Sequence, residues 1–397
     1  MNTSTLLKSG GEKGDVVLES IREQRDIRVY DSYDVIIIGG GVAGMSAALA
    51  ARRNGMRTLL VEKAAFMGGL ATLGHVCLYL PLCDGNGRKV IGGISEELLH
   101  LSIQYGYNDL PEGWTRGILH HPDPKGRYKT WFNIPAFVLA ADELMENEGV
   151  DILYDTVFCE PVMDGKTVTG VIVENKSGRC AYKAKMVVDA SGDADVLYRA
   201  GAACFDRPTI LSYWCYETDF KHMRKALESG NIRDAVVVPM MGLLPKIEPE
   251  DMTGERADKP GERGQMREYY GTDGKEVSQY LQVSRKFALE RLKERMGPEY
   301  TQLSVAGMGA FRTTRRITGC YELHPEDMNK HFDDSIGCTG DWRKAGPVYE
   351  IPYRCLIDPE VQNVFAAGRI IASADDAWEV TRVIPTAAMT GEAAGTA

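Results

Sequence analysis

Residues 33–54 read YDVIIIGGGVAGMSAALAARRN, and this stretch decides the fold. Val35–Ile38 is an uninterrupted β-branched run, which is typical of a strand buried on both faces of a parallel sheet. After the glycines, Val42–Arg53 has the alanine-rich composition of a helix, and Gly55 is placed to end it. Arg57–Val61 indicates a second strand. The stretch therefore predicts one strand–helix–strand unit of an α/β fold.

The glycines of this stretch have the spacing of a dinucleotide-binding loop. Gly39 allows the tight turn, Gly41 lets the backbone approach a pyrophosphate, and Gly44 lets the helix pack against the strand. The free N–H groups at the start of the helix favour a phosphate. Glu62 ends the second strand, where a carboxylate can accept hydrogen bonds from both ribose hydroxyls and disfavours a 2′-phosphate. A tight turn without a ligand is the alternative, and the register of strand, glycines, helix and acid argues against it.

Three further segments carry small residues where a backbone can approach a cofactor. They are Gly68–Thr72 after the acid, Asp189–Asp193 at the end of an apolar strand, and Val364–Arg369, a strand followed by glycine. Each is also compatible with an ordinary loop. Arg382–Thr386 leads into a helix whose positive end would stabilise a reduced flavin, and Arg382 would add a full charge. An ion pair with Glu379 is the alternative for this arginine.

The order of the predicted elements is discontinuous. Thr156–Met163, Thr167–Glu174 and Arg179–Ala184 are β-like runs separated by hairpin signals, which predicts an antiparallel meander followed by a separate strand, Lys185–Asp189. A further strand is expected at Arg354–Ile357. Because the composition changes at Phe205, we predict a nucleotide-binding domain split between 31–204 and 346–397, with a substrate or cap domain at 205–345. A surface loop is expected at Pro249–Lys275, and an irregular segment at Asp109–Arg127.

Composition excludes several classes of function. The chain has 397 residues and a formal net charge of −10, which argues against nucleic acid as the main partner. Its nine cysteines form no C-x-x-C pair, so neither a zinc site nor an iron–sulfur cluster is expected, and no metal is predicted. No stretch has the length of a membrane span and no secretory signal is present, so we expect a soluble cytoplasmic protein without a membrane partner.

Five motifs together resemble the FAD-dependent oxidoreductases of the glutathione-reductase structural class, and most closely the bacterial group related to fumarate reductase flavoproteins. The motifs are VIIIGGGVAGMSAALAARRNG with VEK, GGLAT, VVDASGDADVLYRAGA, RTTRRITGCYEL, and the final segment from YEIPYRCLIDPEVQNVFAAGR to the last residue. The resemblance covers most of 33–397. It implies a Rossmann-like FAD-binding domain with a β-meander, a mixed α+β substrate or cap domain, and FAD as the cofactor.

The resemblance also implies which residues bind FAD. For the ADP half they are Gly39, Gly41, Val42, Ala43, Gly44, Glu62 and Lys63, with the backbone of Val157 at the adenine and Ala190, Ser191 and Gly192 close by. For the ribityl chain and the flavin ring they are Gly69, Leu70, Ala71, Thr72, Gly368, Arg369, Arg382, Val383, Pro385, Thr386 and Ala387.

Flavin enzymes exchange a hydride through N5 and need a proton donor or acceptor and a group that polarises the substrate. The candidates for these catalytic roles are His75, Arg312, Arg316, Asp376 and Arg382. A structural histidine and ordinary ion pairs are the alternatives. The catalytic arginine and histidines of fumarate reductases have no counterpart that can be placed, so fumarate and succinate are not predicted as substrates.

These observations predict an FAD-dependent dehydrogenase or reductase that acts on a small polar organic molecule. An electron-transfer or non-enzymatic flavoprotein subunit that works with a redox partner is the alternative. A tRNA-modifying flavoprotein is a third possibility, which the negative charge and the lack of a basic aromatic patch disfavour. A homo-oligomer and an electron-transfer partner are both left open.

Overall fold

The structure is a computed structural model, and it describes all residues except 1–2, 8–19, 109, 111–128 and 242–266. The predicted irregular segment at 109–127 and most of the predicted loop at 249–275 therefore lie outside the described residues. Among the residues that are described, no helix has both the length and the apolar composition that crossing a membrane requires.

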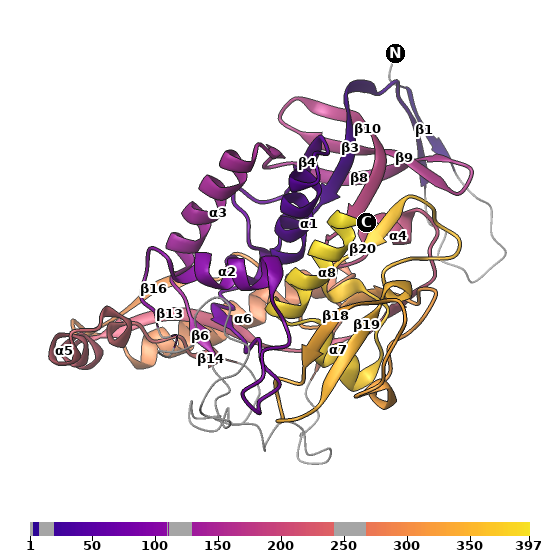
Figure 1. Cartoon of the computed structure of the whole chain (residues 1–397). Coiled ribbons are helices and arrows are strands. Elements are labelled where there is room, and N and C mark those ends of the chain that lie inside the picture. Colours follow the sequence, from indigo (N-terminus) through magenta and orange to yellow (C-terminus); the bar gives the residue numbers. More distant parts are fainter. Residues whose placement is uncertain (1–2, 8–19, 109, 111–128, 242–266) are drawn as a thin grey trace.

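A sheet that contains five parallel strands forms the centre of the molecule (Figure 1). Across the sheet these strands are β7 (Asp151–Leu153), β4 (Thr58–Val61), β3 (Arg28–Ile38), β10 (Gly178–Asp189) and β20 (Val364–Ala366). The predicted strand–helix–strand unit is present, with α1 (Val42–Arg53) between β3 and β4. The last strand of the sheet, β20, comes from the carboxyl-terminal part of the chain. The sheet is therefore built from segments that are far apart in the sequence, as the order of the predicted elements indicated.

The antiparallel meander is continuous with this sheet. β8 (Val157–Asp164) pairs with β9 (Thr167–Asn175), and β9 pairs with the first half of β10. The prediction of two separate strands at 179–184 and 185–189 was wrong, because β10 runs through both. One edge of β10 pairs with β3 along its length, while the other edge pairs first with β9 and then with β20. The pairing of β10 with β3 has a register shift between Ala181 and Tyr182.

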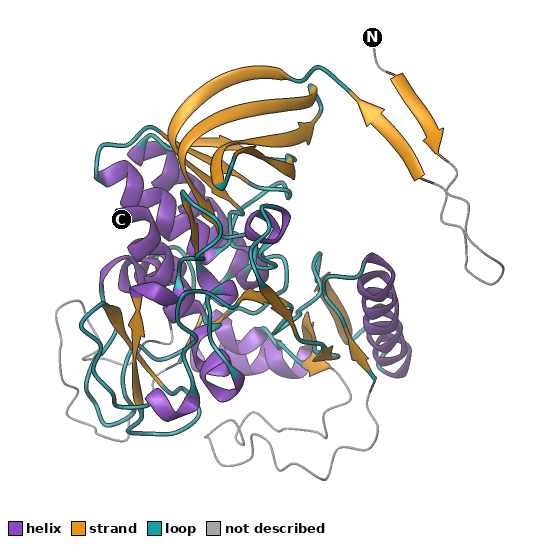
Figure 2. Ribbon diagram, turned by 90° about the vertical axis from the view of Figure 1, so that its right-hand side faces the viewer, coloured by secondary structure: helices purple, strands orange, loops and turns teal. Residues whose placement is uncertain are grey.

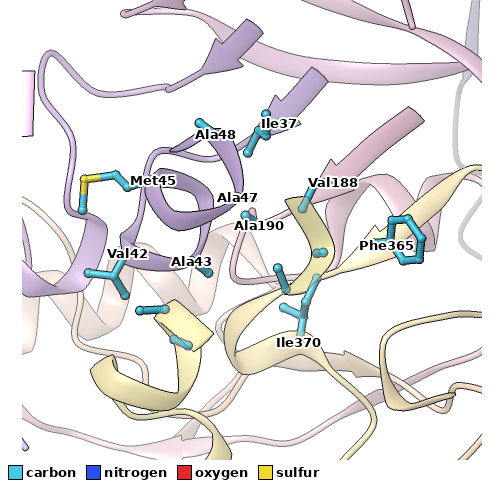
Figure 3. Packing of buried hydrophobic residues seen from close by; sticks show 14 of the residues in the cluster. Ile37, Val42, Ala43, Met45, Ala47, Ala48, Val188, Ala190, Phe365 and Ile370 are labelled. Atoms are coloured by element: carbon cyan, nitrogen blue, oxygen red, sulfur yellow. The ribbon is translucent and has the colours of Figure 1, made fainter. Parts of the chain in front are cut away.

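The helices beside the sheet come from both ends of the chain. α1 packs against α8 (Ile384–Thr396), and α2 (Gly93–Ile103) packs against α8 and against α3 (Ile134–Glu148). Figure 3 shows part of the resulting core, in which Ala47 and Ala48 of α1 lie beside Ile37 of β3 and Val188 of β10. α2 and α8 are also joined by a hydrogen bond, in which the carboxylate of Glu392 in α8 accepts from the N–H of Ile94 at the start of α2.

Residues after the sheet strand β10 form a second region of short strands and helices (Figure 2). Its elements are α4 (Asp195–Arg199), β11 (Cys204–Asp206), β12 (Thr209–Ile210), β13 (Tyr213–Asp219), α5 (Phe220–Ser229), β14 (Met240–Met241), β15 (Glu268–Tyr269), α6 (Gly274–Glu294), β16 (Tyr300–Val305) and β17 (Arg315–Ile317). β13 pairs with both β14 and β16, and a small separate core forms where Tyr280 of α6 stacks on Phe311 at 4.2 Å between ring centroids.

The chain then returns toward the sheet through β18 (Ser335–Gly340) and β19 (Val348–Pro352), with α7 (Asp375–Thr381) leading to α8. The division into 31–204, 205–345 and 346–397 stays a prediction, and its boundary at 345 falls inside the β18–β19 hairpin. The strand predicted at Arg354–Ile357 was wrong. Pro352 ends β19, and a 3₁₀ turn at Tyr353–Cys355 follows, in which the Asp334 carboxylate accepts hydrogen bonds from Arg354.

Two short antiparallel strand pairs complete the described fold. β5 (Leu78–Tyr79) pairs with β6 (Thr130–Trp131), which follows α2 in the chain, and β1 (Thr3–Leu7) pairs with β2 (Ser20–Gln24) in a hairpin. The hairpin of β1 and β2 lies apart from the rest of the chain in Figure 2.

The contact between α1 and α8 depends on glycine. A Cβ added to Gly391 would lie 2.0 Å from the carbonyl oxygen of Ala43, and one added to Gly395 would lie 2.2 Å from that of Ala47. Both distances are far below a van der Waals contact, and the atoms that would be met belong to the backbone. The two helices therefore touch backbone to backbone, one turn apart on each helix.

We expect Gly391→Ala to destabilise the protein by about 1–3 kcal/mol, because the new methyl group overpacks this contact. In a helix without such a neighbour, a Gly→Ala change stabilises the protein by up to about 1 kcal/mol. The sign of the change in the free energy of unfolding therefore distinguishes the two cases. Urea unfolding measures the difference. The control is Gly274→Ala in α6, where a Cβ meets nothing within 4 Å. Equal stability of Gly391→Ala and the natural protein would contradict the close contact.

Candidate functional site

The first glycine loop joins β3 to α1, and its glycines have different reasons to be glycine. Gly39 has a φ of 101°, and a Cβ there would lie 2.4 Å from the carbonyl oxygen of Ala190. A Cβ on Gly44 would lie 1.8 Å from the carbonyl oxygen of Gly39. A Cβ on Gly41, in contrast, meets nothing within 4 Å. Packing thus requires Gly39 and Gly44, whereas Gly41 leaves open space at the start of α1, where no side chain caps the helix.

The predicted ribose acid lies against this loop. Glu62 is 4% exposed at the end of β4, and its two carboxylate oxygens accept hydrogen bonds from the N–H groups of Gly40 at 2.6 Å and Ala64 at 2.8 Å. Lys63 beside it is exposed. The start of β8 is close, because the N–H of Thr156 donates to the carbonyl oxygen of Glu62, and Val157 follows with half of its surface exposed.

The second glycine segment lies directly beside the first. The N–H of Gly68 donates to the carbonyl oxygen of Gly40 at 2.8 Å, and a Cβ on Gly69 would lie 3.2 Å from the Cα of Gly41. Leu70 and Ala71 continue in a 3₁₀ turn, Gly69–Ala71, which the Thr72 hydroxyl ties down by donating to the carbonyl oxygen of Met67. The two segments that the sequence marked separately therefore line one surface.

The third segment follows β10 and is built around a buried carboxylate. Asp189 is fully buried, and its side chain accepts hydrogen bonds from the backbone and hydroxyl of Ser191 and from the N–H groups of Val196 and Leu197. Burial raises the pKa of Asp189 to about 6, against the effect of these hydrogen bonds. Asp189 thereby fixes the course of Ala190, Ser191 and Gly192 beside Gly39.

The fourth segment, at the carboxyl end of the chain, closes the site. Gly368 has a φ of 80°, and a Cβ there would lie 3.0 Å from the Cβ of Ala43. The guanidinium of Arg369 donates to the carbonyl oxygens of Gly192 at 2.5 Å and Phe311 at 3.1 Å and to the carboxylate of Asp193 at 2.9 Å. Arg369 therefore joins protein segments and has little hydrogen-bonding capacity left for a cofactor.

The start of α8 lies in this fourth segment as well. Val383 precedes the helix without a side-chain cap, the carbonyl oxygen of Pro385 accepts a hydrogen bond from Ser95, and Thr386 shares a hydrogen bond with Thr339 at 2.7 Å. Ala387 is buried beneath them.

His75 connects the second glycine segment to the second region of the chain. The residue is 7% exposed and has a φ of 58°, which is uncommon for a side chain of this size. Its Nε2 lies 3.1 Å from the hydroxyl of Ser304, and its ring meets Tyr216 edge-on at 5.3 Å between centroids. Burial lowers the pKa of His75 below its ordinary value of 6.5, so the neutral imidazole is favoured.

Arg382 and Arg312 belong to one cluster of charges at the start of α8. Glu379 accepts two hydrogen bonds from Arg382, one of them from Nε at 2.8 Å, and Arg207 lies on its other side with Nη1 4.0 Å from Oε1. The guanidinium of Arg312 donates to the sulfur of Met240 at 3.4 Å. Burial opposes the charge on Glu379, but the positive charges of Arg382, Arg312 and Arg207 lower its pKa overall.

Arg316 and Asp376 lie in ion pairs, which is the alternative that the sequence left open. Arg316 is 4% exposed, donates to Glu322 at 2.8 Å, and packs on the rings of Phe205 and Trp378. Asp376 is exposed and pairs with Arg343 at 3.1 Å. Among the described residues, neither the Arg316 nor the Asp376 side chain forms a hydrogen bond or ion pair with the glycine segments.

Sequence reasoning did not single out Arg207, Tyr216 or Ser304. They stand in no motif, and β13 and β16, which carry Tyr216 and Ser304, have no apolar alternation that marks the facing side chains. Only their contacts with Glu379 and His75 bring them to the site.

Comparison with known proteins identifies the family of the chain. The model of the family described as FAD dependent oxidoreductase matches residues 34–205 and 252–397, which is more than half of the chain. Digeranylgeranylglycerophospholipid reductase from Picrophilus torridus is 28% identical over 41% of this chain and 39% of its own length. 3-Oxosteroid 1-dehydrogenase from Mycolicibacterium smegmatis is 54% identical over 18% of this chain and 13% of its own length.

The match spans about two fifths of the length of the reductase and less of the dehydrogenase. The solved structure of p-nitrophenol 4-monooxygenase from Pseudomonas putida shares 12% identity over 87% of this chain and 74% of its own, with a TM-score of 0.47. The family match includes all four segments described above, from the glycine loop after β3 to α8. The chain belongs to the FAD dependent oxidoreductase family, and its cofactor is FAD.

Proposed function

We propose that this protein transfers a hydride between a small polar organic substrate and FAD. The observation that carries the proposal is the meeting of four chain segments at the carboxyl ends of β3, β4, β10 and β20. Their glycines pack so closely that most tolerate no side chain, yet Gly41 faces open space. In open α/β sheets, ligands bind at this end of the strands.

The residues that would hold FAD follow from their chemistry. The uncapped start of α1 and the bare backbone of Gly41 suit the pyrophosphate, because N–H groups and the helix dipole favour an anion. Glu62 suits the ribose hydroxyls, with Val157 at the adenine. The segments Gly69–Thr72 and Val383–Ala387 suit the flavin. When bound, FAD supplies a two-electron acceptor or donor at N5.

The chain itself supplies a proton acceptor and positive charge. His75 is held in its neutral form by burial, and a neutral imidazole can accept a proton from a substrate. It lies between the second glycine segment and β16, so a substrate held there would touch both regions. The charge cluster around Glu379 lies at the start of α8. We retain 205–345 as the region that faces the substrate.

We expect Gly41→Ala to weaken FAD binding about 10-fold or more without loss of stability of the FAD-free protein, because the added methyl group meets only the cofactor. Titration of FAD against the FAD-free protein by fluorescence measures the dissociation constant, and thermal unfolding measures stability. Gly44→Ala is the contrasting variant, since its Cβ would collide with the backbone at 1.8 Å and destabilise the fold. If Gly41→Ala binds FAD as tightly as the natural protein does, the proposal that FAD binds at this loop is wrong.

The hydride step has its own test, which is anaerobic reduction of bound FAD by hydroxy acids, amines and sugars and reoxidation by enoates. Bleaching or recovery of the visible flavin absorbance by one of these compounds supports the proposal. Reduction only by a protein partner would favour the electron-transfer alternative instead.

We also expect stability to depend on pH through His75. Its pKa is lowered in the folded state, so below about pH 6.5 the unfolded chain binds a proton that the folded chain refuses, and stability falls as the pH decreases. His75→Asn, which tolerates a positive φ, removes this contribution. Urea unfolding at about pH 7.5 and about pH 5.5 should show the variant gaining relative to the natural protein at the lower pH.

His331→Asn is the control of opposite sign. The carboxylate of Glu350 raises the pKa of the exposed His331, so this variant should lose relative to the natural protein as the pH falls. The same pH response in both variants would show that His75 is not held neutral by burial.

A further inference from the structure

Arg207 has no carboxylate within hydrogen-bond distance in the described part of the site. Its Nη1 is buried without a hydrogen-bond partner, and its contact with Glu379 is long at 4.0 Å. The same carboxylate is already held by two hydrogen bonds from Arg382. A buried polar atom without a partner is costly, so a ligand that brings an acceptor to Nη1 relieves this cost. Nε of Arg316 is unpartnered in the same way, but the guanidinium of Arg316 also has Glu322 at 2.8 Å.

Other arginines nearby show how the chain neutralises a guanidinium that has only a structural role. Arg316 has Glu322 at 2.8 Å, Arg369 has Asp193 at 2.9 Å, and Arg343 has Asp341 at 3.0 Å. Each of these pairs is within hydrogen-bond distance, whereas Arg207 has no described carboxylate that close. The difference separates Arg207 from the structural ion pairs around it.

The backbone of Arg207 is held in place, while its side chain is 40% exposed. The backbone N–H of Arg207 donates to the carbonyl oxygen of Thr314 at 2.7 Å, and the Thr314 hydroxyl donates to the carbonyl oxygen of Gly192 at 3.0 Å. Its guanidinium lies 6.0 Å from the centre of the Trp378 ring. Two hydrogen bonds therefore connect the backbone of Arg207 to the third glycine segment, and the guanidinium lies near Trp378 and Glu379.

We propose that Arg207, together with Arg312 and Arg382, binds a carboxylate group of the substrate. The inference rests on the proposed function, because it assigns this anion to the molecule that exchanges a hydride with FAD. A guanidinium matches a carboxylate with two parallel hydrogen bonds, and a partly buried site strengthens them. Glu379 competes with the substrate for the same cations, which keeps the site from holding small anions too tightly.

The test uses the FAD-loaded protein and isothermal titration calorimetry. The probes are acetate, succinate and benzoate, each compared with its uncharged amide, and inorganic phosphate as a different anion. We expect at least one carboxylate to bind and its amide not to bind. Inorganic phosphate tests whether the site recognises phosphate rather than carboxylate, and tighter binding of phosphate than of every carboxylate overturns the assignment.

Variants then locate the binding. Arg207→Ala should weaken the carboxylate about 10- to 100-fold, as the loss of a charge-assisted hydrogen bond does, with the affinity for FAD unchanged. Arg207→Lys should restore part of it, because the charge stays while the planar fork is lost. Glu379→Gln should tighten binding, since the competing charge is removed. Arg57→Ala is the matched control, because Arg57 pairs with Asp31 at the opposite end of the sheet strands.

Three results would overturn the inference. They are the absence of binding of any carboxylate at millimolar concentration, an Arg207→Ala variant that binds as well as the natural protein, and an Arg207→Ala variant that loses FAD, which would assign the charge to the cofactor. A different result would contradict the proposed function, namely that no substrate reduces the bound flavin. If a neutral compound reduces the flavin and no carboxylate binds, only the carboxylate inference is wrong.

Discussion

Backbone-to-backbone packing around α1 is the constraint on which the rest of the structure depends. Gly44 of the helix packs against the carbonyl oxygen of Gly39, Gly39 packs against that of Ala190, and α8 packs on the helix. Both contacts are too close for any side chain, so glycines from the two ends of the chain have to meet at one helix. In a densely packed interior of this kind, the position of one segment fixes the position of the next. It sets the distance between the first glycine loop and the start of α8 without help from a ligand.

That packing also explains why the cofactor site has so few charged residues of its own. Asp189 and Arg369 both lie in it, yet each is used up by protein groups: Asp189 by the donors around Ser191 and α4, and Arg369 by Gly192, Asp193 and Phe311. They shape the loops that line the site. In the proposed site, the backbone N–H groups at the start of α1 and the open space at Gly41 remain for the cofactor. The carboxylate of Glu62 already accepts hydrogen bonds from Gly40 and Ala64 and would accept further ones from the ribose hydroxyls. Arg207, by contrast, has no carboxylate within hydrogen-bond distance among the described residues, and the proposed carboxylate site is based on that difference.

Local sequence predicted the elements where one pattern dominated. α1 has the predicted bounds, because an alanine-rich run between glycines has no competing structure, and β4 and β20 lie at or near their predicted positions. β3 ends at the predicted Ile38 but begins at Arg28, before its predicted start at Val35. The error at β10 has a physical cause. Lys183 and Lys185 interrupt the apolar pattern in the middle of the strand, but pairing with β3 continues past them, and the pairing partners of a strand are not written in its own residues. At Arg354, a β-like composition was overridden by Pro352 and by hydrogen bonds to Asp334.

The sequence by itself determined that the chain has a dinucleotide-binding loop, an acid to follow it, and small residues in three later segments, because glycine spacing and strand ends are local features that a linear pattern records. Only the tertiary structure decided that these segments share one surface and that β10 joins the meander to the parallel sheet. It also decided which charged side chains are paired with protein groups. The sequence singled out Arg316 and not Arg207, yet Glu322 lies 2.8 Å from Arg316 while the carboxylate nearest Arg207 is already held by Arg382. The charge left for a ligand depends on distances between residues far apart in the chain, and no local pattern contains them.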